Sequence, residues 1–571
     1  MKGKFARNNI GLILLVLTVL LCLVQVMRTQ RQLDPPGKKV IRIAFWQLEA
    51  GYREAMQAMI DEYQKLHPDV VIRQMPITER LYAQWLNVHL IAGDAPDLCE
   101  MGMATLTNTD QPKIRYFTPL AEPLDQPNPY NAGTQFEKLA WRETFIDGNR
   151  GQFSDSLQEY FAVPTSFYGA GVYYNATLLA AAKAEAGIDT PIPPRTFGQW
   201  IEISQAVRAY GKKRGKNIAP IVSCYNVANP SFLLEQYTVA FTAGVEPTVD
   251  ANLDGRISAW ETYAGFIQPN SVIAFESERM RAFYHTYKRL MGEFADGYIA
   301  MTRQDAMFRF VQGDAAMIVT GSWDAKSLSQ QAGDRFKLGA MKYPVPVRGD
   351  MVTIDGQQVD VGQFVAGPMN SAGATGGAGY GIYKRSKHPE VALDFLHFLT
   401  SVKNNGRFNA YCDWAPAVAG SELSDLVKPF MPDPEGYTSE VMFDLSADLG
   451  AVYEGKLAQF LTGELTYPQF AKAMTEAMTN PTNGGDRAAA RLHENDRTSV
   501  RNDERTLAAQ TALAILGPET QGAMATEVPL PTRQEAAARA KKILLQQVRK
   551  NNGNESRARF LDVRGKELQV R

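Results

Sequence analysis

Hydrophobic residues from Val40 onward follow two alternating spacings. Short apolar runs predict strands, and apolar residues three or four positions apart predict amphipathic helices. Strands are expected at 40–45, 70–75 and 97–101, and helices at 54–66 and 81–92. This β-α-β-α-β order predicts a parallel sheet whose ligand-binding groups lie beyond the carboxyl ends of its strands.

The stretch 304–323 repeats the pattern further along the chain. A helix is expected over 304–311 and ends at Gly313, because glycine is the usual residue after a helix. A buried strand at 315–320 then places Trp323 at its carboxyl end. The flat ring of Trp323 would suit stacking on the C–H face of a sugar, and the alternative is a core or lid residue.

The N-terminus carries one uninterrupted apolar segment. Residues 10–27 contain no charge and extend about 27 Å as a helix, close to the thickness of a bilayer core. No Ala-x-Ala cleavage site follows, and Leu21 before Cys22 is not the small residue that a lipoprotein signal needs. We therefore expect an uncleaved signal anchor with the body outside the cytoplasm, although basic residues flank the segment on both sides.

Composition removes several classes of function. The 571 residues include 60 basic and 61 acidic side chains, so a nucleic-acid partner is not expected. The four cysteines form no Cys-x-x-Cys pair and imply neither a zinc site nor a disulfide framework. The six histidines are scattered, and no hydrolase or nucleotide-binding motif is present, so we expect no catalytic residues. A glycan-processing enzyme remains a weaker alternative, because paired carboxylates cannot be recognised by spacing here.

Residues 250–261 match the 12-residue calcium loop of EF-hands. Carboxylate, amide and hydroxyl oxygens stand at the ligand positions, and Gly255 occupies the sharp turn. The expected ligands are Asp250, Asn252, Asp254, the Arg256 carbonyl, Ser258 and Glu261. A single loop predicts a structural calcium ion rather than a switch, and the alternative is an acidic turn without metal.

Five segments resemble, in order, the solute-binding proteins of ABC importers, the family that includes maltose-binding protein. They are 41–46, 93–97, 171–175, 310–323 and 377–383, the last followed by a helix over 389–399. The resemblance implies an α/β periplasmic-binding-protein type II fold with two lobes around a hinge cleft. The implied organisation is an anchor at 1–31, a linker at 32–39, lobe 1 at 40–166 and 364–405, lobe 2 at 167–363 and 406–479, and a tail at 480–571.

The resemblance also implies a ligand site at the strand ends and the two crossovers between lobes. The residues at matching positions are Trp46, Glu49, Glu79, Glu100, Met101, Phe167, Tyr168, Tyr225, Trp323, Phe364 and Trp414. Aromatic rings would stack on sugar faces, and carboxylates would accept hydroxyl hydrogen bonds. The implied function is capture of a sugar or oligosaccharide for an ABC permease. A sensor or scaffold of the same fold is the alternative, and a similar calcium loop in relatives that bind acidic oligosaccharides suggests a uronate.

The chain beyond residue 480 differs in character from the rest. Residues 480–505 are highly charged, and 533–550 form a basic segment rich in helix-forming residues. We expect a solvated helix or a partly disordered tail. The alternative is a helix that docks on a partner or on a lobe.

Overall fold

The computed structural model describes most of the chain between residues 35 and 501. The described residues are 18–19, 35–102, 110–154, 157, 159–224, 232–250, 257–366, 375–421, 423–431, 441, 445, 447–480, 488–498 and 501. Within these ranges, no helix has both the length and the apolar character needed to span a bilayer. The anchor expected at 10–27 lies outside the described residues, apart from Thr18 and Val19.

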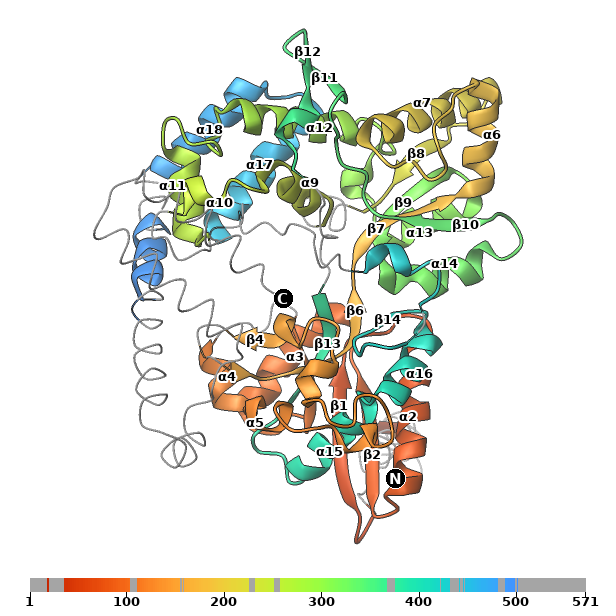
Figure 1. The fold of residues 1–571 in the computed structure, drawn as a ribbon, viewed down its shortest axis with the longest axis vertical. Coiled ribbons are helices and arrows are strands. Elements are labelled where there is room, and N and C mark those ends of the chain that lie inside the picture. The colour runs from red at the N-terminus through yellow and green to blue at the C-terminus, as the bar shows by residue number, and fades with distance from the viewer. Residues whose placement is uncertain are drawn as a thin grey trace, which may run out of the picture.

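A six-stranded mixed sheet forms the centre of lobe 1, the lower half of Figure 1, with the order β14-β6-β13-β3-β1-β2. The strands β1, β2 and β3 run parallel to one another, which confirms the predicted β-α-β-α-β unit. The other strands pair antiparallel. Their bounds are β1 Lys39–Phe45, β2 Val70–Pro76, β3 Leu98–Met101, β6 Val163–Tyr168, β13 Thr375–Ile382 and β14 Ala415–Pro416.

The helices of lobe 1 bury apolar faces against this sheet. Helix α3 ends where predicted, since Gly93 adopts the left-handed conformation at φ 84°. Fully buried aromatic side chains such as Tyr52, Tyr63 and Trp141 fill the core. The main helices are α2 Tyr52–Leu66, α3 Glu79–Ala92, α15 Pro389–Leu399 and α16 Val402–Cys412, with shorter elements α4 Asp110–Tyr116, α5 Ala121–Leu124, β4 Phe153–Ser154 and β5 Glu159–Tyr160.

A four-stranded sheet with the order β10-β7-β9-β8 forms the centre of lobe 2. Helices α6, α7, α13 and α14 accompany it, and a second helical layer lies at the upper left of Figure 1. The strands are β7 Ala170–Asn175, β8 Ala219–Val222, β9 Ala315–Gly321 and β10 Leu338–Met341, and the hairpin is β11 Met351–Ile354 with β12 Gln357–Asp360. The helices are α6 Ala176–Ala186, α7 Phe197–Lys213, α9 Phe232–Thr242, α10 Glu246–Val249, α11 Ala259–Ile267, α12 Glu278–Met291, α13 Arg303–Gln312, α14 Ala325–Ala332, α17 Ala447–Thr462 and α18 Tyr467–Thr479.

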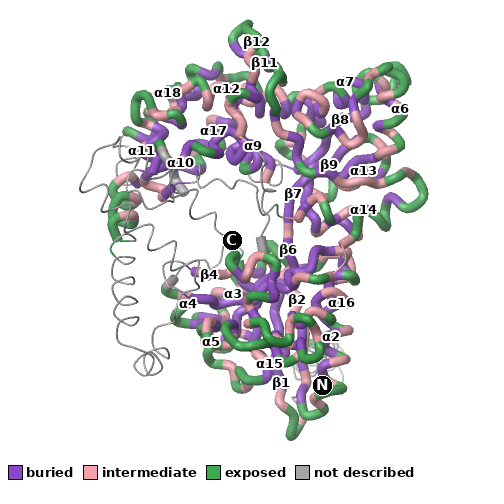
Figure 2. The backbone as a smooth tube through the Cα atoms, in the orientation of Figure 1, coloured by how far each residue is buried: buried purple, intermediate pink, exposed green. Residues whose placement is uncertain are grey.

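The chain crosses between the two sheets at Gly169. Strands β6 and β7 follow each other there almost without interruption, and Figure 2 shows them as one buried path through both lobes. A Cβ atom on Gly169 would lie 2.1 Å from the Phe430 carbonyl oxygen, so the close approach requires glycine. The expected first crossover near Phe167 and Tyr168 is therefore one or two residues early.

The boundary expected at 405/406 must be moved toward the C-terminus. Helix α16 packs on α2, and β14 pairs with β6 in the lobe 1 sheet. The Asn409 side chain also donates to the Thr165 carbonyl at 2.8 Å. The segment through Pro416 thus belongs to lobe 1, because hydrogen bonds distant in sequence recruit it to that sheet.

The first part of the tail is attached to lobe 2. Residues 488–498 are helical. Ala488 is buried in the lobe 2 core, and the His493 ring lies 4.8 Å from Trp260. This segment fits the alternative of a helix docked on a lobe, while 533–550 lie outside the described residues.

Candidate functional site

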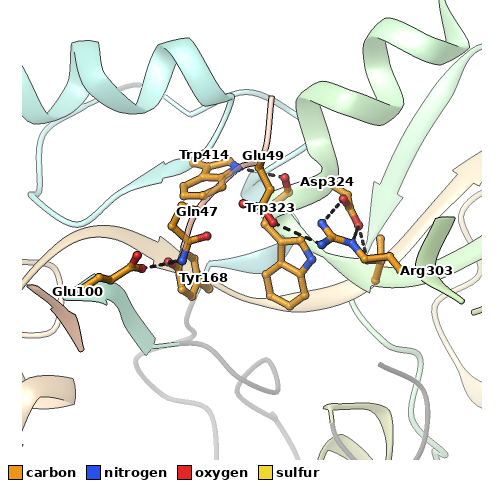
Figure 3. A network of polar contacts seen from close by, with 9 residues as sticks. Gln47, Glu49, Glu100, Tyr168, Arg303, Trp323, Asp324 and Trp414 are labelled. Atoms are coloured by element: carbon orange, nitrogen blue, oxygen red, sulfur yellow. Dashed lines mark hydrogen bonds and ion pairs between the residues drawn. The ribbon is translucent and has the colours of Figure 1, made fainter. Parts of the chain in front are cut away.

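Side chains from both lobes meet where β1 and β9 end and where β6 crosses to β7 (Figure 3). We call this group the inter-lobe site. It consists of Gln47, Glu49, Glu100, Tyr168, Arg303, Trp323, Asp324 and Trp414. The position agrees with the rule that ligands of open α/β sheets bind beyond the carboxyl ends of strands.

Arg303 links the two lobes electrostatically. It is the first residue of α13, after the capping box of Thr302. Its Nη2 lies 2.5 Å from Asp324 of the same lobe, and its Nη1 lies 3.3 Å from Glu49 of lobe 1. Burial alone would lower the pKa of Arg303, but the two carboxylates raise it, so the guanidinium stays charged.

The two carboxylate oxygens of Glu49 differ in their hydrogen bonding. Its Oε1 accepts from Arg303, whereas its buried Oε2 has no hydrogen-bond partner among the described residues. Burial raises the pKa of Glu49, and the Arg303 charge opposes that shift. A buried acceptor without a donor is costly, so this oxygen is available to a donor that enters the site.

Trp323 occupies the short 3-10 helix Ser322–Asp324 directly after β9. Its ring is only partly buried and lies 5.6 Å from Phe232 and 6.1 Å from Tyr168. A Cβ atom on Gly321 would lie 2.3 Å from the Trp323 ring, so glycine makes room for it. Trp414 donates its indole hydrogen to the Trp323 carbonyl oxygen at 3.2 Å and thereby ties the two lobes together.

Glu100 organises the lobe 1 side from within the core. It accepts from the Trp46 backbone at 3.0 Å and from Gln47 Nε2 at 2.7 Å. Gln47 also donates to the Tyr168 hydroxyl at 3.0 Å. Glu100 is fully buried, and desolvation raises its pKa well above the usual range, which favours the neutral form.

The expected ligand residues fall into separate places. Glu49, Tyr168 and Trp323 converge at the inter-lobe site. The Trp46 ring packs 4.9 Å from Tyr82 within lobe 1, and its backbone donates to Glu100. Glu100 and Trp414 are buried behind it and position their neighbours through the hydrogen bonds given above. The remainder are Met101 and Phe167 in the core, Glu79 exposed at the start of α3, Phe364 beside the Arg279 guanidinium at 5.8 Å, and Tyr225 outside the described residues.

The sequence analysis did not predict four residues that lie at or beside the inter-lobe site: Gln47, Phe232, Arg303 and Asp324. Gln47 stands next to the expected Trp46, and Asp324 directly follows Trp323, so proximity to a strand end was a usable signal. Arg303 gives no such signal, because it begins a helix far from the strand ends in sequence. Only the fold brings it to Glu49.

The calcium loop is described only at its two ends. Asp250 and Glu261 are both almost fully buried. Glu261 also accepts from the Ser258 backbone at 3.0 Å in the capping box that starts α11. Asn252, Asp254 and Arg256 lie outside the described residues, and the described part of the chain holds no cluster of three metal-binding acids, cysteines or histidines.

A separate hollow lies on the surface of lobe 1. Its lining includes Glu62, Lys65, Tyr130, Phe398 and Asn404. None of the residues expected to bind ligand contributes to it, so we do not associate it with the inter-lobe site.

Comparison with models of protein families assigns the chain to one family. Residues 49–406 match the family model described as bacterial extracellular solute-binding protein. A search among curated proteins finds no match.

Solved structures share the fold at low sequence identity. A probable secreted solute-binding lipoprotein from Streptomyces coelicolor is 17% identical, with a TM-score of 0.53 over 78% of this chain and 99% of that one. RafE of Streptococcus pneumoniae, in complex with raffinose, is 15% identical, with a TM-score of 0.52 over 78% and 99%. The sugar-binding protein MalE of Xanthomonas citri is 15% identical, with a TM-score of 0.51 over 81% and 99%.

Proposed function

The chain belongs to the bacterial extracellular solute-binding protein family, and on that premise we propose that it captures a carbohydrate between its two lobes for import by an ABC system. The observation that carries the proposal is the convergence of Tyr168 and Trp323 with the carboxylate of Glu49 at the inter-lobe site. Aromatic faces and a hydrogen-bond acceptor at strand ends are the groups that hold a sugar ring.

The action proposed is binding without chemical conversion. The family matched is one of solute-binding proteins, and relatives were solved with raffinose and as a chitin oligosaccharide binding protein. Closure of the lobes on the ligand would bury it, and the closed form would then dock on a permease. Family membership favours a periplasmic or extracellular body, and residues 10–27 are proposed to hold it at the membrane.

A thermal-shift screen of residues 35–571 tests the proposal. Maltotriose, xylotriose, raffinose and chitotriose at 1 mM are the probes. A ligand that binds only the folded protein raises the melting temperature by mass action. At a concentration of 100 times its Kd, it adds about 2.7 kcal/mol to the free energy of unfolding. At least one oligosaccharide is expected to give a shift, and the folded protein without added sugar serves as the blank. If neither these sugars nor a wider glycan panel shifts the transition, the capture function is contradicted.

Calcium is proposed as a structural ion in the loop 250–261. The support is the ligand spacing in the sequence together with two carboxylates, Asp250 and Glu261, that are buried at the two ends of the loop. Ser258 and Glu261 would serve both the loop and the start of α11.

Removal of calcium is expected to lower the melting temperature. Saturation at about ten times the Kd stabilises a folded protein by about 1.4 kcal/mol, and a chelator removes that amount. Melting curves with 1 mM calcium and with excess EGTA measure the difference. Asp254→Ser should abolish the response, while Asp189→Ser, outside the loop, should retain it. Equal melting temperatures in calcium and EGTA for the unchanged protein would exclude a bound ion of this kind.

A further inference from the structure

Apolar and backbone contacts join the two lobes directly at the crossover. Phe167 and Ala415 of lobe 1 are buried in one cluster with Leu328 of α14 in lobe 2. The Ser322 backbone of lobe 2 donates to the Gly169 carbonyl oxygen at 2.9 Å. Because these contacts lie where the chain passes between the lobes, they change least when one lobe rotates on the other.

Polar contacts extend this junction from the crossover into the first turn of α14. Trp414 donates its indole hydrogen to the Trp323 carbonyl oxygen at 3.2 Å (Figure 3). Three residues further on, the Lys326 ammonium donates to the Tyr411 carbonyl oxygen at the end of α16. Ser322, Trp323 and Lys326 thus contact lobe 1 in the order of the sequence, so the restraint on rotation continues beyond the crossover.

Gly51 brings the start of α2 to the same place. A Cβ atom on Gly51 would overlap the Tyr411 carbonyl oxygen and would lie 2.9 Å from Lys326 Nζ. Its φ of 91° is also in the left-handed region that favours glycine. Glycine at this position therefore allows α2 and α16 of lobe 1 to meet α14 of lobe 2.

Arg303 is bound more firmly to its own lobe than to lobe 1. Its Nη2 and Nε lie 2.5 Å and 3.2 Å from the Asp324 carboxylate, which also accepts from the Thr320 hydroxyl at 2.6 Å. Its contact with Glu49 of lobe 1 is a single one at 3.3 Å. A pair of charge-assisted hydrogen bonds is stronger than one longer contact, so separation of the lobes would break the contact with Glu49 and keep that with Asp324.

Glu49 is only partly stabilised in the present arrangement. Its buried Oε2 has no hydrogen-bond partner among the described residues, and burial raises the pKa of Glu49 against the effect of the Arg303 charge. Movement of Glu49 into water would satisfy that oxygen, which offsets part of the loss of Arg303. The contact between Glu49 and Arg303 can therefore be released at moderate cost.

We propose that these polar contacts form a releasable clasp that sets the arrangement of the two lobes in the absence of ligand. The clasp consists of Glu49, Gly51, Tyr411 and Trp414 of lobe 1 and of Arg303, Trp323 and Lys326 of lobe 2. The lobes separate on this side when Glu49 leaves Arg303, and the apolar contacts at the crossover act as the pivot. The inference goes beyond the proposed capture of carbohydrate and does not depend on it, because the clasp acts before any ligand arrives.

The distance between two spin labels tests the clasp in the full chain, in detergent and without ligand. Gln330→Cys on α14 and Lys403→Cys on α16 provide exposed labelling positions on the two lobes. Cys22→Ser removes the cysteine of the N-terminal apolar segment, and the other three native cysteines are buried. Double electron–electron resonance then measures the distribution of distances. We expect one narrow distribution when the clasp residues are unchanged.

Two substitutions in the clasp should each add a longer distance. Glu49→Gln removes the charge that faces Arg303, and Lys326→Met removes the contact with the Tyr411 carbonyl oxygen. Together they should raise the ratio of longer to original distances at least about fivefold, because both contacts favour the same arrangement of the lobes.

The control is Glu62→Gln, which breaks the ion pair with Arg407 inside lobe 1 and should leave the distribution unchanged. Circular dichroism identifies any variant that fails to fold, and Lys326→Met, at an exposed contact, then carries the test alone. An unchanged distribution in the folded clasp variants overturns the inference. An equal change in Glu62→Gln also overturns it, since the longer distance would then reflect general loosening of the protein.

Discussion

Replacement of Arg303 by alanine is expected to lower the free energy of unfolding by about 3–5 kcal/mol, because it leaves a buried charge without its partner. The Asp324 side chain is only 3% exposed, and the Thr320 hydroxyl would remain as a side-chain donor to it. Glu49, across the lobe junction, would lose its ion pair as well. Urea unfolding monitored by circular dichroism measures the change.

The control for Arg303→Ala is an ion pair that water already solvates. Lys472 and Glu476 lie 3.8 Å apart, with side chains 75% and 65% exposed. Lys472→Ala should therefore change stability by less than about 1 kcal/mol. A double-mutant cycle of Arg303→Ala with Asp324→Asn should show a coupling above about 1 kcal/mol, since the two residues are in contact. A loss below 1 kcal/mol in Arg303→Ala would show that solvent, rather than Arg303, satisfies Asp324.

Removal of the Trp323 ring is expected to weaken sugar binding by about 2 kcal/mol or more, which is about 30-fold in Kd. The ring is partly exposed beside Phe232 and Tyr168, so we expect it to offer one face to a ligand. Trp323→Ala deletes that face but keeps the backbone carbonyl that accepts from Trp414. Titration of the sugar found in the thermal screen measures the loss.

A second substitution tests the position of the ring rather than its presence. Gly321→Ala would bring a methyl group within 2.3 Å of the Trp323 ring, so the ring must move. We expect a smaller loss of affinity than in Trp323→Ala, with the intrinsic fluorescence of the unliganded protein altered. Phe308→Ala, on an exposed part of α13, should retain full affinity. Undiminished binding by Trp323→Ala would return this residue to the alternative of a packing or lid residue.

Local features of the fold could be predicted from the sequence because neighbouring residues cause them. Gly313 ends α13 in the left-handed conformation at φ 82°, as its place after the amphipathic run predicts. Thr196 caps α7 by accepting from the Gln199 backbone, and a threonine just before a helix is a local signal of this kind. Strands β1, β2 and β3 lie within a residue or two of the predicted ranges, since buried parallel strands appear as continuous apolar runs.

Reasoning from the local sequence predicted only part of the candidate site. Strand ends directed attention to Glu49 and Trp323, which both lie at the inter-lobe site, and to Trp46, whose ring packs on Tyr82 within lobe 1. The same rule also nominated Met101 and Phe167, although both are core residues. Successive side chains of a strand point to opposite faces, and the sequence does not state which face a neighbouring element covers. Glu100 illustrates the limit, because its position after a strand predicts a ligand contact but its burial makes it a support for Gln47 and Trp46.

The sequence by itself determined the order of helices and strands and the family. Only the tertiary structure shows that the segment through Pro416 belongs to lobe 1 and that Arg303 is the cation facing Glu49. Arg303 and Glu49 are 254 positions apart, and no local pattern relates them. Their contact forms where the sheets of the two lobes meet at a crossover. The pairing and burial of side chains at that place depend on the packing of both lobes at once.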